Sequence, residues 1–256
     1  MNEKYLKLDP APIAEAIFCV DMAGTPPLIP ARLPDLMSAM DNAYVKESDI
    51  LVKTMTFNLQ KDGETVTPLQ QTSGVRFKKE KVHVIGLSNL DQQVVRFGYS
   101  RLKPYASWDE FITEAKRMFG RFLEVRKCDP VVKRIGVRFI NVLPVDAERC
   151  KMSDVLYSVP VDPKGITNIN IDDFFYRDTA YYSDFDLKAT VIRASSKDPN
   201  GKLLAIYDAD IFTNPELENS KLQLDELLDR VHALKNALFF GGVSEIWYKK
   251  YKHETK

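Results

Sequence analysis

The sequence has few of the residues on which recognisable catalytic and metal centres depend. Its 256 residues include three histidines and three cysteines, at widely separated positions. Cys19, Cys128 and Cys150 form no CxxC pair and are odd in number, so neither a zinc ribbon nor a disulfide framework is indicated. Motifs for phosphate-binding loops, dinucleotide binding, nucleophile elbows, zinc proteases and calcium loops do not occur. We therefore predict no catalytic residue, no metal and no cofactor from motifs.

An excess of charge of one sign is also missing. Lysine and arginine number 36, aspartate and glutamate number 36, and the formal net charge is zero. A general nucleic-acid binder usually carries a basic excess, so nucleic acid is disfavoured as a partner, although a local basic patch at Arg76–Lys81 stays open. No apolar run approaches the roughly 20 residues of a membrane span, and the charged start is unlike a signal peptide. We expect a cytoplasmic protein without a membrane partner.

Hydrophobic residues, at 45% of the chain, are sufficient for a full core. The clearest helix is predicted at 108–126, where Ser107 is a good N-cap and Glu110 completes a capping box. A second long helix is predicted at 220–239, with Gly241 and Gly242 as its stop, while the basic tail after it is expected to fray. Strands are predicted at 12–20, 50–59, 74–88 as a hairpin, 92–100, 131–143, 185–195 and 202–212, with short helices after Leu33 and at 152–158 and 171–176.

The order of these elements indicates an α+β fold, an antiparallel β-sheet covered by the two long helices. A strand, a polar loop and an amphipathic helix follow one another in both parts of the chain. We therefore predict two pseudo-symmetric halves, residues 1–128 and 129–256, packed against each other as one compact unit. The alternative is coincidence, because residue identity between the halves is negligible.

The segment RIGVRFIN is the most unusual in the chain, because Arg134 and Arg138 share one face of a central-looking strand. Two arginines beside Gly136 could bind a phosphate or carboxylate of a ligand. The interpretation we favour is that each pairs with a carboxylate of a neighbouring strand, since a buried charge must be paired. The candidates for ligand binding or structural ion pairing are Arg134, Arg138, Glu15, Asp208, Asp210 and Asn141.

Asp208 and Asp210 allow a second interpretation. Two carboxylates on one side of a strand are an arrangement that divalent metals use in hydrolases and nucleases, here with Glu15. The D-x-D pattern is common by chance, and no motif fixes a third acidic residue. A metal-dependent hydrolase or nuclease is therefore an alternative hypothesis.

Five segments in combination, PIAEAIF, SRLKPYASWDEF, RIGVRFINVLPV, AIYDADIF and HALKNALFF, resemble an uncharacterised, sporadically distributed family of bacterial proteins of similar length. The resemblance extends over essentially the whole chain. It implies a bacterial cytosolic protein of the accessory genome, with a role such as mobile-element conflict or phage defence. It implies no reaction and supplies no catalytic residue.

Our first functional hypothesis is a non-enzymatic binding or interaction protein, a phage-defence or toxin–antitoxin-type component that recognises a protein or a ligand. The metal-dependent hydrolase or nuclease is the first alternative, and a nucleic-acid binder using the saddle of a duplicated sheet is the second. The expected partner is an unidentified protein, with a small ligand or phosphate as a further candidate. A homodimer is expected only because it is the commonest oligomer.

Overall fold

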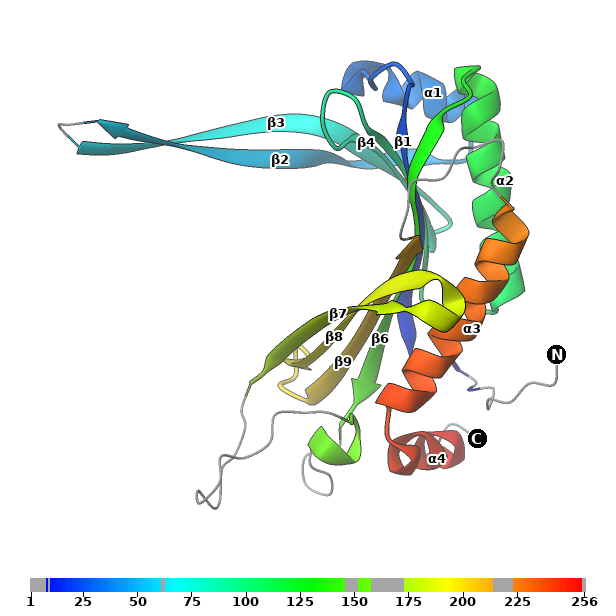
Figure 1. The fold of residues 1–256 in the computed structure, drawn as a ribbon. Coiled ribbons are helices and arrows are strands. Elements are labelled where there is room, and N and C mark those ends of the chain that lie inside the picture. The colour runs from blue at the N-terminus through cyan, green and yellow to red at the C-terminus, as the bar shows by residue number, and fades with distance from the viewer. Residues whose placement is uncertain are drawn as a thin grey trace.

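A computed structural model of the protein describes residues 8, 10–60, 63–145, 152–157, 173–213 and 223–254. The described strands form one sheet of nine, in the order β2-β3-β4-β5-β1-β6-β9-β8-β7, and every neighbouring pair is antiparallel (Figure 1). The strand bounds are β1 Ile13–Ala23, β2 Val45–Gln60, β3 Gly63–Lys79, β4 His83–Asn89, β5 Val95–Leu102, β6 Val131–Pro144, β7 Phe175–Tyr182, β8 Leu187–Lys197 and β9 Leu203–Thr213.

The described helices are α1 Leu33–Met40, α2 Trp108–Arg126, α3 Leu224–Gly242 and α4 Glu245–Glu254, with short 3-10 turns at η1 Pro30–Arg32, η2 Met152–Asp154 and η3 Ser183–Phe185. α2 begins and ends where the sequence predicts, because the Ser107 side chain accepts a hydrogen bond from the Glu110 N–H at 3.1 Å. Phe119 and Phe122 of α2 pack on Phe97 of β5, with ring centroids 5.4 and 5.5 Å apart. The next long helix, α3, packs on β9.

β1 lies at the centre of the sheet, between β5 and β6, as its two apolar faces predict. Alternate β1 residues, including Phe18 and Val20, are fully buried in the main core beneath α2. The strands up to residue 102 form one contiguous block, and those from 131 form another. The two blocks meet where Phe18 of β1 lies opposite Val137 of β6. The boundary at residues 128 and 129 between two halves stays a prediction.

The prediction of a sheet covered by two long helices is wrong. Nine strands about 4.8 Å apart form a sheet some 40 Å wide, whereas a helix is about 10 Å across. Both α2 and α3 lie on the same face, and the β2–β3 hairpin extends beyond them (Figure 1). The first block has five described strands, among them this long hairpin, and the second has four described strands; the pseudo-symmetry of the two halves stays a prediction.

Two elements differ from the predictions for local reasons. Residues 171–176 were expected to be helical, but β7 begins at Phe175; it is an edge strand exposed on both faces, so it shows no apolar alternation. The basic tail was expected to fray, yet α4 is held in place by Trp247, whose Nε1 donates to the Pro144 carbonyl at 3.1 Å. Gly241 and Gly242 are the last two residues of α3 and do not lie beyond its end, as the predicted stop after residue 239 required. Among the described helices, none has the length and apolar character needed to cross a membrane.

Candidate functional site

The two faces of the sheet differ in chemistry. Successive residues of a strand point to opposite faces, and Phe18, Val137 and Ala209 belong to the buried side that faces the helices. Their neighbours therefore point the other way. We call this second face, on which no described helix lies, the open face. Its central residues are Cys19 and Asp21 on β1, Arg96 on β5, Arg134, Gly136 and Arg138 on β6, and Asp208, Asp210 and Phe212 on β9.

The structure brings four of the six predicted site residues together on the open face as two ion pairs. Arg138 donates from Nε and Nη2 to the two carboxylate oxygens of Asp208, at 2.8 and 2.5 Å. The hydrogen bonds to Asp208 raise the pKa of Arg138 further above its ordinary value. Asp208 is only 5% exposed. Such a two-point contact between guanidinium and carboxylate occupies both acceptors of the acid.

Arg134 forms the second pair by lying flat across the strand. Its Nη2 donates to both oxygens of Asp210 at 2.8 Å, and its Nη1 donates to Cys19 Sγ at 2.9 Å. The guanidinium lies over the Phe212 ring, 4.6 Å from the centroid. Gly136 makes this position available, because a Cβ atom there would lie 2.4 Å from Arg134 Nη1.

The sequence did not indicate a third ion pair on the open face. Together with the first two pairs, it forms a row of arginines across the sheet. Arg96 Nε and Nη2 donate to the two oxygens of the buried Asp21 at 2.6 and 2.8 Å. Glu15 also lies on the open face, opposite Ile140, but no cation in the described part of the chain forms an ion pair with it. The arginines of this row are thus neutralised by aspartates from neighbouring strands and not by Glu15.

Cys19 does not have the character of a nucleophile. Burial raises the pKa of its thiol, and this effect outweighs the opposite effect of the Arg134 charge. The reactive form of cysteine is the thiolate, which a raised pKa disfavours at neutral pH. The Cys19 sulfur therefore acts as a hydrogen-bond acceptor for Arg134.

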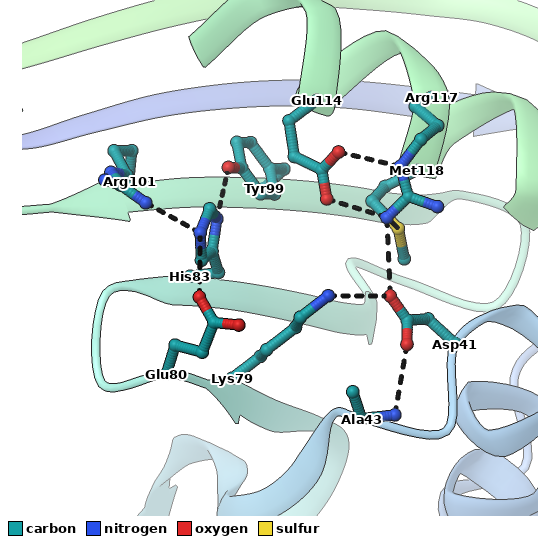
Figure 2. A network of polar contacts seen from close by, with 10 residues as sticks. All are labelled: Asp41, Ala43, Lys79, Glu80, His83, Tyr99, Arg101, Glu114, Arg117 and Met118. Atoms are coloured by element: carbon teal, nitrogen blue, oxygen red, sulfur yellow. Dashed lines mark hydrogen bonds and ion pairs between the residues drawn. The ribbon is translucent and has the colours of Figure 1, made fainter. Parts of the chain in front are cut away.

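A second polar network, on the helix side of the sheet, joins α2 to β3 and to the loop after α1 (Figure 2). Asp41 accepts from the Ala43 N–H at 3.0 Å, from Lys79 at 3.2 Å and from Arg117 at 3.3 Å. Arg117 also donates two hydrogen bonds of 2.7 Å to Glu114. Burial acts to raise the pKa of Asp41, but its three donors outweigh that effect and lower it. These charges are mutually satisfied, which is the pattern of a structural anchor.

His83 belongs to the neighbouring part of this network and is a neutral imidazole there. Arginine can only donate, so the contact of 2.6 Å between Arg101 Nη1 and His83 Nε2 requires a lone pair on Nε2. The proton then lies on Nδ1, which donates to the Tyr99 hydroxyl at 2.7 Å (Figure 2). Burial first, and the Arg101 charge second, lower the pKa of His83. Its role is to connect β4 and β5.

Sequence reasoning missed a cavity on the helix side of the sheet. It has a volume of about 330 Å³ and lies between the start of β1, the N-terminal end of α2, and α3. Lys235 of α3 lines it, with the ammonium 5.1 Å from the centroid of the Phe139 ring. Burial lowers the pKa of Lys235 to about 8. We call this space the Lys235 cavity.

One signal in the sequence could have pointed to this cavity. Val231, Lys235 and Leu238 follow at spacings of four and three, so the lysine interrupts an apolar helical stripe. Asn141, the sixth predicted site residue, lines the same cavity, on the face opposite to the arginines. Its Nδ2 donates to the carbonyl oxygens of Tyr207 at 3.0 Å and Phe139 at 3.4 Å.

Comparison of the chain with protein-family models finds no match, and comparison with curated proteins finds no similar sequence. The resemblance to a sporadically distributed bacterial family therefore stays a prediction. Function has to be argued from the two faces of the sheet.

Proposed function

We propose that the protein is a non-enzymatic binding protein whose open face receives a protein partner. The observation that carries this proposal is the charge balance of that face. Arg96, Arg134 and Arg138 are each paired with an aspartate, so the row is polar and ordered without being basic. A surface of paired charges fits a partner that itself carries mixed charges, as protein surfaces do.

The outer strand β7 adds exposed aromatic side chains to the open face. Phe175 is 69% exposed and Tyr181 is 51% exposed, and both point to this face because they lie opposite Ala194 and Lys188 of β8. Aromatic residues are enriched in protein–protein interfaces. As the last described strand of the sheet, β7 also offers backbone groups to which a partner can add a strand. The partner is therefore expected at the β7 side of the open face.

The alternatives from the sequence receive less support. A nucleic-acid site draws its affinity from cations that are free to neutralise phosphates, and the three central arginines already have carboxylate partners. A metal site would need the oxygens of Asp208 and Asp210, and in each of these carboxylates both oxygens already accept hydrogen bonds from one arginine. The described residues also include no cluster of three or more histidine, cysteine or acidic side chains arranged to hold a metal. A cytoplasmic, accessory role in phage defence is a proposal that rests on the sequence resemblance.

The proposal can be tested with a photocrosslinking residue at two matched positions of β7. Tyr181 and Tyr176 are similarly exposed, at 51% and 48%, but point to opposite faces of the sheet. We expect p-benzoylphenylalanine at position 181 to give one discrete adduct with another protein in cells of the source organism. The same group at position 176 should give none.

The captured protein is then purified and titrated against the unmodified chain. Arg177→Glu, on the open face four residues before Tyr181 along β7, should weaken that binding by at least about tenfold, which corresponds to 1.4 kcal/mol. Equal adduct yields at the two positions, an adduct between two copies of the chain, or retention on nucleic acid that falls with salt would each contradict the proposal.

A further inference from the structure

The ammonium of Lys235, a half-buried side chain, lacks the partner that a charge withdrawn from water normally has. A charged side chain removed from water is usually paired with an opposite charge, because desolvation costs several kcal/mol. In the described part of the chain, no carboxylate forms an ion pair with Lys235, and its contact is with the face of the Phe139 ring at 5.1 Å. A cation over an aromatic ring is stabilised only in part. The Lys235 cavity therefore holds a positive charge that an anion could neutralise.

A second polar group in the same cavity is also left without a partner. The hydroxyl of Tyr105 is buried, and within the described residues it has no hydrogen-bond partner. Its ring packs edge-on against Phe139, with centroids 6.2 Å apart at 83°. Leaving such a group unsatisfied costs about 1–3 kcal/mol. The wall of the cavity thus carries a buried, unsatisfied hydroxyl besides the ammonium.

A pair of stacked rings forms part of the cavity wall. The rings of Trp108 and His232 stack in parallel, with centroids 4.6 Å apart and planes 6° apart. Burial, and secondly the Lys235 charge, lower the pKa of His232 to about 4, so the imidazole adds no charge at neutral pH. Asp109 also lines the cavity, and its charge acts on His232 and Tyr105 and not on Lys235. Aromatic walls of this kind suit a planar or apolar ligand body.

We propose that the Lys235 cavity is a binding site for a small organic monocarboxylate with an aromatic or apolar body. The carboxylate would accept hydrogen bonds from the Lys235 ammonium, while the body of the ligand packs on Trp108 and Phe139. The volume of about 330 Å³ falls at the lower end of the range for small-molecule sites. Because the cavity lies on the helix side of the sheet, this site is separate from the open face and does not depend on the partner proposed for it.

Isothermal titration of the full chain with benzoate and with its neutral isostere benzamide tests the proposal. We expect saturable binding of benzoate at pH 7 and at least about tenfold weaker binding of benzamide, since only benzoate offers an anion to Lys235. Lys235→Met should weaken benzoate binding by at least about tenfold. Lys188→Met, on the open face, is the matched control and should bind benzoate like the unmodified protein.

Hexanoate, titrated in parallel, separates the headgroup from the body of the ligand. If benzoate and hexanoate both bind, and hexanoate binds more weakly, the aromatic walls contribute to the affinity as proposed. Equal affinity for benzoate and benzamide would overturn the site. So would affinity for benzoate that is unchanged in both the Lys235→Met and the Lys235→Gln variants. Failure of benzoate and hexanoate to saturate the protein at millimolar concentrations would overturn it as well.

Discussion

At the scale of single residues, Lys235 makes folding depend on pH in an unusual direction. Its pKa is about 8 in the folded chain and 10.5 in its ordinary state. Between these values the unfolded chain holds a proton that the folded chain has lost, so stability rises as pH rises. Below pH 8 both states are charged and the full cost of burial applies; above pH 10.5 both are neutral and the cost is gone.

Replacing Lys235 by methionine should therefore stabilise the protein at neutral pH. We expect the free energy of unfolding at pH 7 to increase by up to about 3 kcal/mol, the equivalent of the lowered pKa. The difference in unfolding free energy between the variant and the unmodified protein should shrink to near zero as pH approaches 10.5. Denaturant titrations at pH 7, 9 and 10.5 would measure it. His232 and Tyr105 do not titrate in this window, because burial lowers the pKa of the first to about 4 and raises that of the second beyond it. A constant difference across these pH values would contradict the effect of the buried charge.

At the scale of single elements, sequence information was sufficient where the cause of a structure is local. The bounds of α2 follow from Ser107 and Glu110, which lie three residues apart. The face on which Arg134 and Arg138 lie follows from strand alternation alone. Which acid each arginine meets depends on the strand order and register, and three candidate carboxylates were open from the sequence. β9, and not β1, supplies the aspartates that pair with Arg134 and Arg138. Each arginine of β6 contacts an aspartate that lies diagonally across from it on β9, and not directly opposite.

The Lys235 cavity could not be derived in the same way. Its walls come from the start of β1, the loop before α2, β6 and α3, which only the folded sheet brings together. β7 was missed for the opposite reason, because an edge strand exposed on both faces carries no periodic burial for a pattern to report.

Two glycines of the open face provide a matched test of strand packing. Gly136 of β6 and Gly98 of β5 both lie opposite Cys19. A Cβ atom at position 136 would meet Arg134 Nη1 at 2.4 Å, whereas at position 98 the nearest atom, the Gly86 carbonyl oxygen, is 3.6 Å away. Gly136→Ala must displace the guanidinium from Asp210 and should cost about 1–3 kcal/mol in unfolding free energy. Gly98→Ala should be neutral or stabilise by about 0.5–1 kcal/mol, as measured by denaturant unfolding. Equal changes in unfolding free energy for the two variants would mean that Arg134 moves aside without any loss of stability.

At the scale of the whole molecule, the balance of charge that gives zero net charge also holds locally in the ion pairs of the open face. Replacing both Asp208 and Asp210 by asparagine changes the formal charge from zero to +2 and leaves Arg134 and Arg138 without their acids. We expect this variant to be retained on a heparin column and to elute with rising salt, whereas the unmodified protein passes through. The pair Asp35→Asn and Asp184→Asn, two exposed aspartates for which the described residues supply no ion-pair partner, removes the same charge elsewhere and controls for net charge alone. If the unmodified protein is retained as strongly, the open face is basic despite its ion pairs.

The central position of β1 also determines how long this strand waits for a neighbouring strand while the protein is being synthesised. Phe18 pairs with Val137, which leaves the ribosome about 120 residues later. At about 5–20 residues per second, the first strand of the chain spends roughly 6–24 s without its neighbour β6. During that interval this apolar strand edge is open to other chains, so we expect the yield of native protein to depend on the chaperones that shield β1 until residue 144 has been made.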